Sequence, residues 1–131
     1  MRIVVISPSA LMTPGAAGRL KARAEELSIE CEIYLEDSEG GLVTAVQKAY
    51  GADGAILCAG DHARYSIAIR DAISSIKNTP VVEVNLSNAA EADSRHASVL
   101  SAVCAGVISG FGQEGYMLAF RALTYEKRKV M

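Results

Sequence analysis

Short apolar runs alternate with amphipathic segments along the whole chain, and this alternation limits the possible folds more than any other feature. The apolar runs have the length of buried strands and cover residues 2–6, 30–35, 54–58, 81–86 and 103–109. The amphipathic segments repeat apolar residues at the helical period and cover residues 13–27, 38–49, 66–77 and 111–129. Strands that alternate with helices of this length build βαβ units around a parallel sheet.

Local signals support these boundaries. Thr13 followed by Pro14 is typical of a helix N-cap with proline at the first helical position, and Pro80 interrupts the chain before the fourth strand. The inward face of the last helix consists of Tyr116, Ala119, Phe120 and Leu123. Right-handed crossovers then predict an α/β, flavodoxin-like fold, a doubly wound three-layer sandwich around a five-stranded parallel sheet of order 2-1-3-4-5.

Length and charge restrict the function. With 131 residues, half of them hydrophobic, the chain fits a single domain over residues 1–131. A net charge of −2 and the lack of a long apolar run argue against nucleic acid and membranes as partners. The three cysteines are widely spaced and have no neighbours at metal-ligand spacing, which indicates thiols in a cytoplasmic protein without a metal or other cofactor.

Sites in sheets of this kind lie beyond the carboxyl ends of the strands. The segments that reach this edge are residues 7–13, 58–65, 85–96 and 109–112. Three stretches that include or adjoin them carry a resemblance: "GADGAILCAGDHARYSIAIRDAI", "PVVEVNLSN" and "SGFGQEGYMLAFRAL". Together they resemble the type II dehydroquinases (3-dehydroquinate dehydratases), over residues 29–124 and more weakly over residues 1–11.

The resemblance implies a fold, an assembly and a reaction. Members of this family have the flavodoxin-like fold and commonly form dodecamers built from trimers. They dehydrate 3-dehydroquinate through an enolate intermediate, with a tyrosine base and an arginine on a mobile lid, a histidine acid, and asparagines that hold a water and the enolate. A homo-oligomer that takes a small-molecule carboxylate is therefore expected.

Several of the family's catalytic positions differ here. Where the family has Asn-Gly-Pro-Asn, residues 7–10 read Ser-Pro-Ser-Ala, and the helix that Thr13 caps leaves no room for the lid with its arginine and tyrosine. Asn85 stands where the family has its acid histidine, and an amide cannot exchange a proton near neutral pH. Arg64 replaces another family histidine.

Other positions match the family. Leu86 and Ser87 correspond to the pair that grips the substrate carboxylate, and Arg95 corresponds to an arginine that binds a substrate hydroxyl. With Asn85 they make up the expected substrate-binding set. Asp71 corresponds to an aspartate that reaches a neighbouring subunit's site.

A polar cluster follows the third strand and supplies the candidate catalytic residues: Asp61, His62, Arg64 and Tyr65. Histidine is a side chain suited to proton exchange near neutral pH, Asp61 can act as a base, and Arg64 can hold an anion. The alternative is a salt-bridge cluster at a subunit interface.

Three further residues receive structural interpretations. Cys58 ends the third strand and is expected to be a small buried residue. Glu83 lies on the same side of its strand as Asn85 and is expected to be a structural partner. His96 is expected to be solvated.

Three functions remain open. The favoured hypothesis is a repurposed, lyase-like enzyme that acts on a different small carboxylate by cofactor-free acid/base chemistry (lyase, isomerase or cyclase). The alternatives are a 3-dehydroquinate dehydratase with a rearranged site and a non-catalytic small-molecule-binding homologue. Loss of base, acid and lid weighs against dehydroquinate dehydration, because each proton-transfer group contributes about 10²- to 10⁴-fold in rate.

Overall fold

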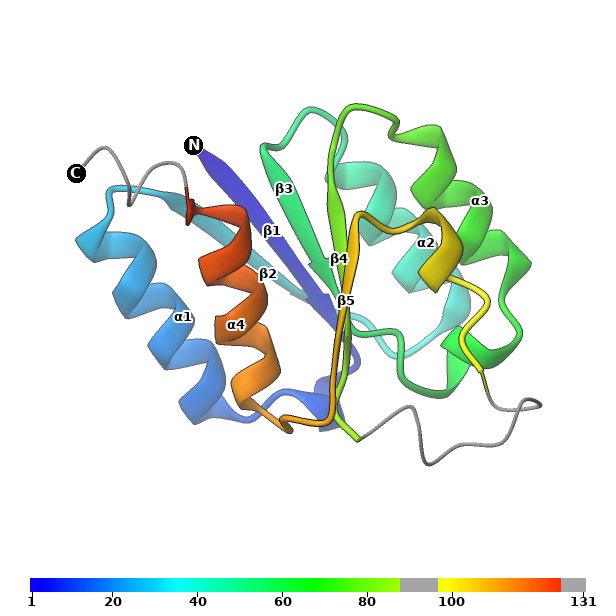
Figure 1. The fold of residues 1–131 in the computed structure, drawn as a ribbon, viewed down its shortest axis with the longest axis horizontal. Helices are drawn as coiled ribbons and strands as arrows, with labels where there is room; N and C mark the ends of the chain where they lie inside the picture. Colours follow the sequence, from blue (N-terminus) through cyan, green and yellow to red (C-terminus); the bar gives the residue numbers. More distant parts are fainter. Residues whose placement is uncertain (88–96, 126–131) are drawn as a thin grey trace.

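The computed structural model describes residues 1–87 and 97–125 and is a three-layer α/β sandwich (Figure 1). Its parallel sheet has the order β2-β1-β3-β4-β5, as the sequence predicts. The strands are β1 (Arg2–Ser7), β2 (Glu30–Leu35), β3 (Gly54–Leu57), β4 (Val81–Asn85) and β5 (Gly106–Ser109). All of their carboxyl ends point to the lower edge of the sheet in Figure 1, where the connections of the candidate site lie.

Helices cover both faces of the sheet (Figure 1). One layer holds α1 (Pro14–Glu26) and α4 (Glu114–Leu123), and the other holds α2 (Glu39–Lys48) and α3 (Ile67–Ser75). Short 3₁₀ turns follow β1 and β3 and precede β5: η1 (Ser9–Leu11), η2 (Gly60–Arg64) and η5 (Ser101–Val103). None of the helices within residues 1–87 and 97–125 is long and apolar enough to cross a membrane.

Side-chain caps set the first residue of three helices. The hydroxyl of Thr13 accepts a hydrogen bond from the amide of Ala16 at 3.1 Å, and Pro14 occupies the first helical position as predicted. Ser38 caps α2 and Ser66 caps α3 in the same way. These bonds satisfy amides that have no partner inside the helix.

Three predicted boundaries within the described residues differ from the structure by two or three residues. The strand predicted over residues 103–109 begins only at Gly106, because residues 101–103 form a 3₁₀ turn. The helix predicted over residues 66–77 ends at Ser75. The last helix begins at Glu114 instead of residue 111, because Gly110 and Gly112 have φ values of +92° and +56°, which a right-handed helix excludes. Residues 126–129 of its predicted end lie outside the described residues.

The core has two halves, one on each face of the sheet. Tyr116, Phe120 and Leu20 pack between α1, α4 and the sheet, while Leu42 and Ile69 pack under α2 and α3. Helix α4 lies very close to β4, since a Cβ on Gly115 would stand 2.9 Å from Cγ1 of Val84. This close approach fixes the start of α4 at the carboxyl edge of the sheet.

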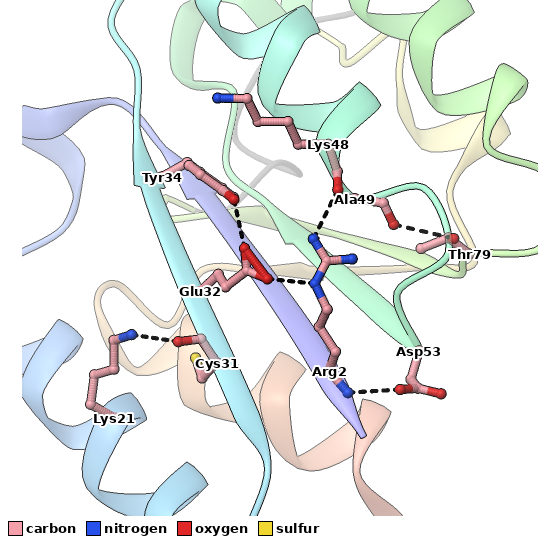
Figure 2. Close-up of polar contacts among 9 residues, drawn as sticks. All are labelled: Arg2, Lys21, Cys31, Glu32, Tyr34, Lys48, Ala49, Asp53 and Thr79. Atoms are coloured by element: carbon pink, nitrogen blue, oxygen red, sulfur yellow. Dashed lines mark hydrogen bonds and ion pairs between the residues drawn. The ribbon is translucent and has the colours of Figure 1, made fainter.

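A polar cluster begins at Arg2, at the amino end of β1, and extends along β2 through Glu32 to Tyr34 (Figure 2). We call Arg2, Glu32, Tyr34, Lys48 and Asp53 the amino-edge cluster, after the position of Arg2. The Arg2 guanidinium donates to Glu32 and to the carbonyl of Lys48, while its backbone amide donates to Asp53 at 2.7 Å. The Tyr34 hydroxyl donates to Glu32 at 2.6 Å. The bonds from Arg2 and Tyr34 hold the pKa of Glu32 below its ordinary value.

Candidate active site

A pocket of about 530 Å³ opens where the carboxyl ends of β3 and β4 meet the connections that follow them. Its lining combines apolar walls with carboxylate, guanidinium, amide and hydroxyl groups. The lining residues are Leu11, Cys58, Gly60, Asp61, Ala63, Arg64, Asn85, Leu86, Ser87, Ala97, Ser98, Ser101 and Val107. The size and mixed chemistry suit a small polar ligand.

The charged groups of the pocket come from the η2 turn. Asp61 and Arg64 line the pocket and form a loose ion pair, with 3.5 Å between Oδ1 and Nη2. Their side chains are 89% and 49% exposed, so water screens this pair strongly. Both charges therefore remain available to a ligand.

The other two candidate catalytic residues lie elsewhere. The Nδ1 atom of His62 lies 2.6 Å from the Tyr65 hydroxyl, and Nε2 lies 3.3 Å from the backbone oxygen of Asp37. Neither His62 nor Tyr65 is among the residues that line the pocket. The 3₁₀ conformation explains the separation, because residues three apart share a face. Asp61 and Arg64 share one face, and His62 and Tyr65 share another.

The predicted substrate-binding residues of β4 do reach the pocket. Asn85, Leu86 and Ser87 line it together. The turn between β5 and α4 holds this strand end in place, because Gly110 and Gly112 donate to the carbonyls of Asn85 and Leu86 at 3.0 and 2.9 Å. The structure thus brings Asp61 and Arg64 to the same pocket as the end of β4.

Three other candidates remain, of which Asp71 alone is among the described residues. Arg95 and His96 lie outside the described residues. Asp71 is exposed on α3 and is absent from the pocket lining. A role at a subunit contact stays a prediction for Asp71. Among residues 1–87 and 97–125, no three His, Cys, Asp or Glu side chains gather as a metal site requires.

Glu83 organises one wall of the pocket. Its side chain is fully buried and accepts hydrogen bonds from the hydroxyls of Ser98 and Ser101, both of which line the pocket. Ser98 also caps the backbone amide of Leu100 at 3.0 Å. The geometry supports a structural partner at Glu83. The sequence did not reveal the role of the two serines, because Glu83, which both of them contact, is 15 and 18 residues away.

Cys58 lines the pocket and has two buried groups beside it, Tyr116 and Ser7. Cys58 is buried at the end of β3, and burial raises the pKa of its thiol. It hydrogen-bonds to Tyr116, whose hydroxyl lies 2.9 Å from Oγ of Ser7 and donates to the carbonyl of Leu11 at 2.7 Å. Burial also raises the pKa of Tyr116. A thiol with a raised pKa is a poor nucleophile, so Cys58 acts as a small buried residue.

Comparisons with known proteins agree on one family. The model of the family "Dehydroquinase class II" matches residues 13–124. The 3-dehydroquinate dehydratase of an Exiguobacterium species is 48% identical over 83% of this chain and 74% of its own length. The enzyme of the same name from Bacillus cytotoxicus is 47% identical over 79% of this chain and 72% of its own length.

Solved structures agree as well. The type II dehydroquinase from Butyrivibrio crossotus is 32% identical, with a TM-score of 0.88 over 95% of this chain and 97% of that one. The type II dehydroquinase from Propionibacterium acnes is 30% identical, with a TM-score of 0.83 over 95% of this chain and 98% of that one. The chain therefore belongs to the class II dehydroquinase family.

These relatives overturn the favoured functional hypothesis. The missing counterparts of the family's acid, base and lid favour a repurposed enzyme that acts on a different small carboxylate. Relatives 44–48% identical over about four-fifths of the chain are named 3-dehydroquinate dehydratase. That hypothesis is wrong because it gave the replaced residues more weight than the similarity of the rest of the chain.

Proposed function

We propose that this chain dehydrates 3-dehydroquinate in the pocket at the carboxyl edge of its sheet. The observation that carries the proposal is the pair of relatives, 48% and 47% identical over most of the chain, that bear this name. The pocket adds support, because its lining includes the end of β4 together with a carboxylate and a guanidinium.

The substrate carboxylate is assigned to the end of β4. Leu86 and Ser87 line the pocket just beyond the end of β4, where backbone amide dipoles favour an anion. Arg95, which follows in the chain, keeps its assignment to a substrate hydroxyl. Asn85 lies beside them and can donate to a substrate oxygen.

The reaction needs a base next to the ketone and a proton for the departing hydroxyl. Asp61 takes the proton from the carbon beside the ketone, and the electron pair of the broken C–H bond forms the enolate. Arg64 stabilises the negative charge on the enolate oxygen. The enolate then expels the neighbouring hydroxyl, which leaves as water with the proton that Asp61 returns. The product is a conjugated enone.

The test is to mix the purified protein with 3-dehydroquinate and follow the enone absorbance, with a relative from Bacillus cytotoxicus in parallel. We expect turnover that the Asp61→Asn variant loses. A Glu25→Gln variant is the matched control, since it makes the same carboxylate-to-amide change at an exposed site on α1 that does not line the pocket. Absence of turnover at high protein concentration, with calorimetric binding of 3-dehydroquinate retained, would instead make the chain a non-catalytic binding homologue.

The assembly and location are part of the proposal. We assign the chain to a homo-oligomer, with the trimer-based dodecamer of the family as the expected form and Asp71 at a subunit contact. The three free cysteines are compatible with a cytoplasmic protein. Light scattering after gel filtration measures the mass directly, and a monomer would contradict this part of the proposal.

A further inference from the structure

Hydrogen bonds and packing hold the connection between β1 and α1, residues 8–13, at several points. Asp37 accepts hydrogen bonds from both the amide and the hydroxyl of Ser9, at 2.8 and 3.0 Å. Leu11 donates to the carbonyl of Pro8 at 3.1 Å, and Met12 is buried in the core. A segment with this many contacts has little freedom to open.

Gln113 makes the most direct of these contacts. It stands immediately before α4, and its side chain meets the connection from across the sheet edge. Its Oε1 accepts from the amide of Thr13 at 2.9 Å, and its Nε2 donates to the carbonyl of Leu11 at 3.0 Å. The Leu11 carbonyl therefore has two donors, Gln113 and the hydroxyl of Tyr116.

Leu11 is the residue that these bonds place over the pocket. It lines the pocket beside Cys58 and Gly60. A Cβ on Gly60 would stand 2.8 Å from Cδ1 of Leu11, and Gly60 has a φ of +59°. The leucine side chain thus packs directly on the turn that carries Asp61, and it lines the same pocket as the buried Cys58.

We propose that Gln113 is a positioning residue, which acts through Leu11 to hold one wall of the pocket in its ligand-ready shape. A wall that is fixed before binding does not have to be ordered by the ligand, so less binding energy is lost. The kinetic part of this inference rests on the proposed dehydratase function, whereas the positioning of Leu11 does not.

The thiol of Cys58 reports on the wall without any substrate. In a Gln113→Leu variant both bonds to the connection are lost, and each neutral hydrogen bond changes an opening equilibrium by up to about tenfold. We expect iodoacetamide to alkylate Cys58 about tenfold faster than in the wild type, as followed by peptide mass mapping. Cys31, buried in β2, is the internal control and keeps its rate.

Two comparisons decide the outcome. A Gln47→Leu variant makes the same change on the exposed face of α2 and is expected to leave the Cys58 rate unchanged. A Gln113→Glu variant keeps the acceptor for Thr13 but loses the donor to Leu11, and we expect an intermediate rate. Unchanged alkylation of Cys58 in Gln113→Leu, or an equal rise at Cys31, overturns the proposal.

Kinetics separates positioning from general damage. In Gln113→Leu we expect KM for 3-dehydroquinate to rise about 3- to 10-fold while kcat changes less than about twofold, because the change affects binding and leaves the reacting groups in place. A fall in kcat with an unchanged KM would contradict it. If the wild type shows no turnover, the dehydratase proposal fails, and the Cys58 rates still decide the role of Gln113.

Discussion

The two edges of the sheet carry polar clusters with opposite properties. In the amino-edge cluster, Glu32 is bonded to both Arg2 and Tyr34, and the pKa of its carboxyl is lowered. At the carboxyl edge, Asp61 and Arg64 stand 3.5 Å apart, are largely exposed and face a pocket. In the amino-edge cluster the charged groups are bonded to other groups of the chain. The charges of Asp61 and Arg64 remain available to a ligand.

This contrast separates a structural cluster from a candidate active site more clearly than residue type does. Both edges hold an arginine and an acidic residue. They differ in how many internal partners each charge has, and in whether a cavity adjoins them. A charged group that is already bonded to two groups of the chain has little hydrogen-bonding capacity free for a substrate.

The sharpest test of the contrast is to remove a charge at the carboxyl edge. Arg64→Gln is expected to lower kcat/KM for 3-dehydroquinate by about 10²- to 10³-fold, since it removes the cation assigned to the enolate oxygen. Arg2→Gln is the matched control at the amino edge and should keep kcat/KM within about twofold. Equal losses in the two variants would break the comparison.

The buried carboxylate of Glu83 should give the next largest effect. Glu83→Gln places an amide opposite the hydroxyls of Ser98 and Ser101, and we expect a loss of about 2 kcal/mol in the free energy of unfolding. Urea unfolding measures it. A loss no larger than that of Glu32→Gln would contradict the assignment of Glu83 as the organiser of the pocket wall.

A smaller loss is expected from Tyr116→Phe. The variant removes one of the two donors to the Leu11 carbonyl, and that carbonyl keeps Gln113. We expect about 1 kcal/mol of lost stability by urea unfolding, together with faster alkylation of Cys58. Tyr50→Phe, at a 70% exposed site, serves as the control and should be neutral.

The smallest effect concerns pH at the amino edge. Because its bonded partners lower the pKa of Glu32, the stability that it contributes is fully present above the ordinary value of 4.5 and is lost as the pH falls through the lowered pKa. In Glu32→Gln the free energy of unfolding should fall less on acidification than in the wild type, by a difference of less than about 1 kcal/mol. Unfolding midpoints at several acidic pH values measure this, and a steeper curve would contradict it.

The fold was predictable from the sequence because it follows from periodicity. Apolar runs, helical stripes and the cap at Thr13 are local signals, and they led to the correct strand order. The late start of the last helix was missed, because it depends on the positive φ values of Gly110 and Gly112, which sequence patterns alone did not reveal.

The candidate site was less predictable because its groups meet through tertiary contacts. Asp61 and Arg64 were expected to act with His62 and Tyr65, but the three-residue period of the η2 turn places these pairs on different faces. Gln113 was missed altogether, since its two partners lie 100 and 102 residues away. No local sequence motif predicts a contact between residues so far apart in the chain.

The central claim is that the carboxyl edge, and not the amino edge, binds the substrate. Hydrogen–deuterium exchange with saturating 3-dehydroquinate tests it most directly, using the Asp61→Asn variant so that substrate is not consumed. The account predicts protection in residues 58–64 and 85–87 and no change in residues 30–32 and 48–53. Protection confined to the amino-edge segments, or none in either region, would contradict it.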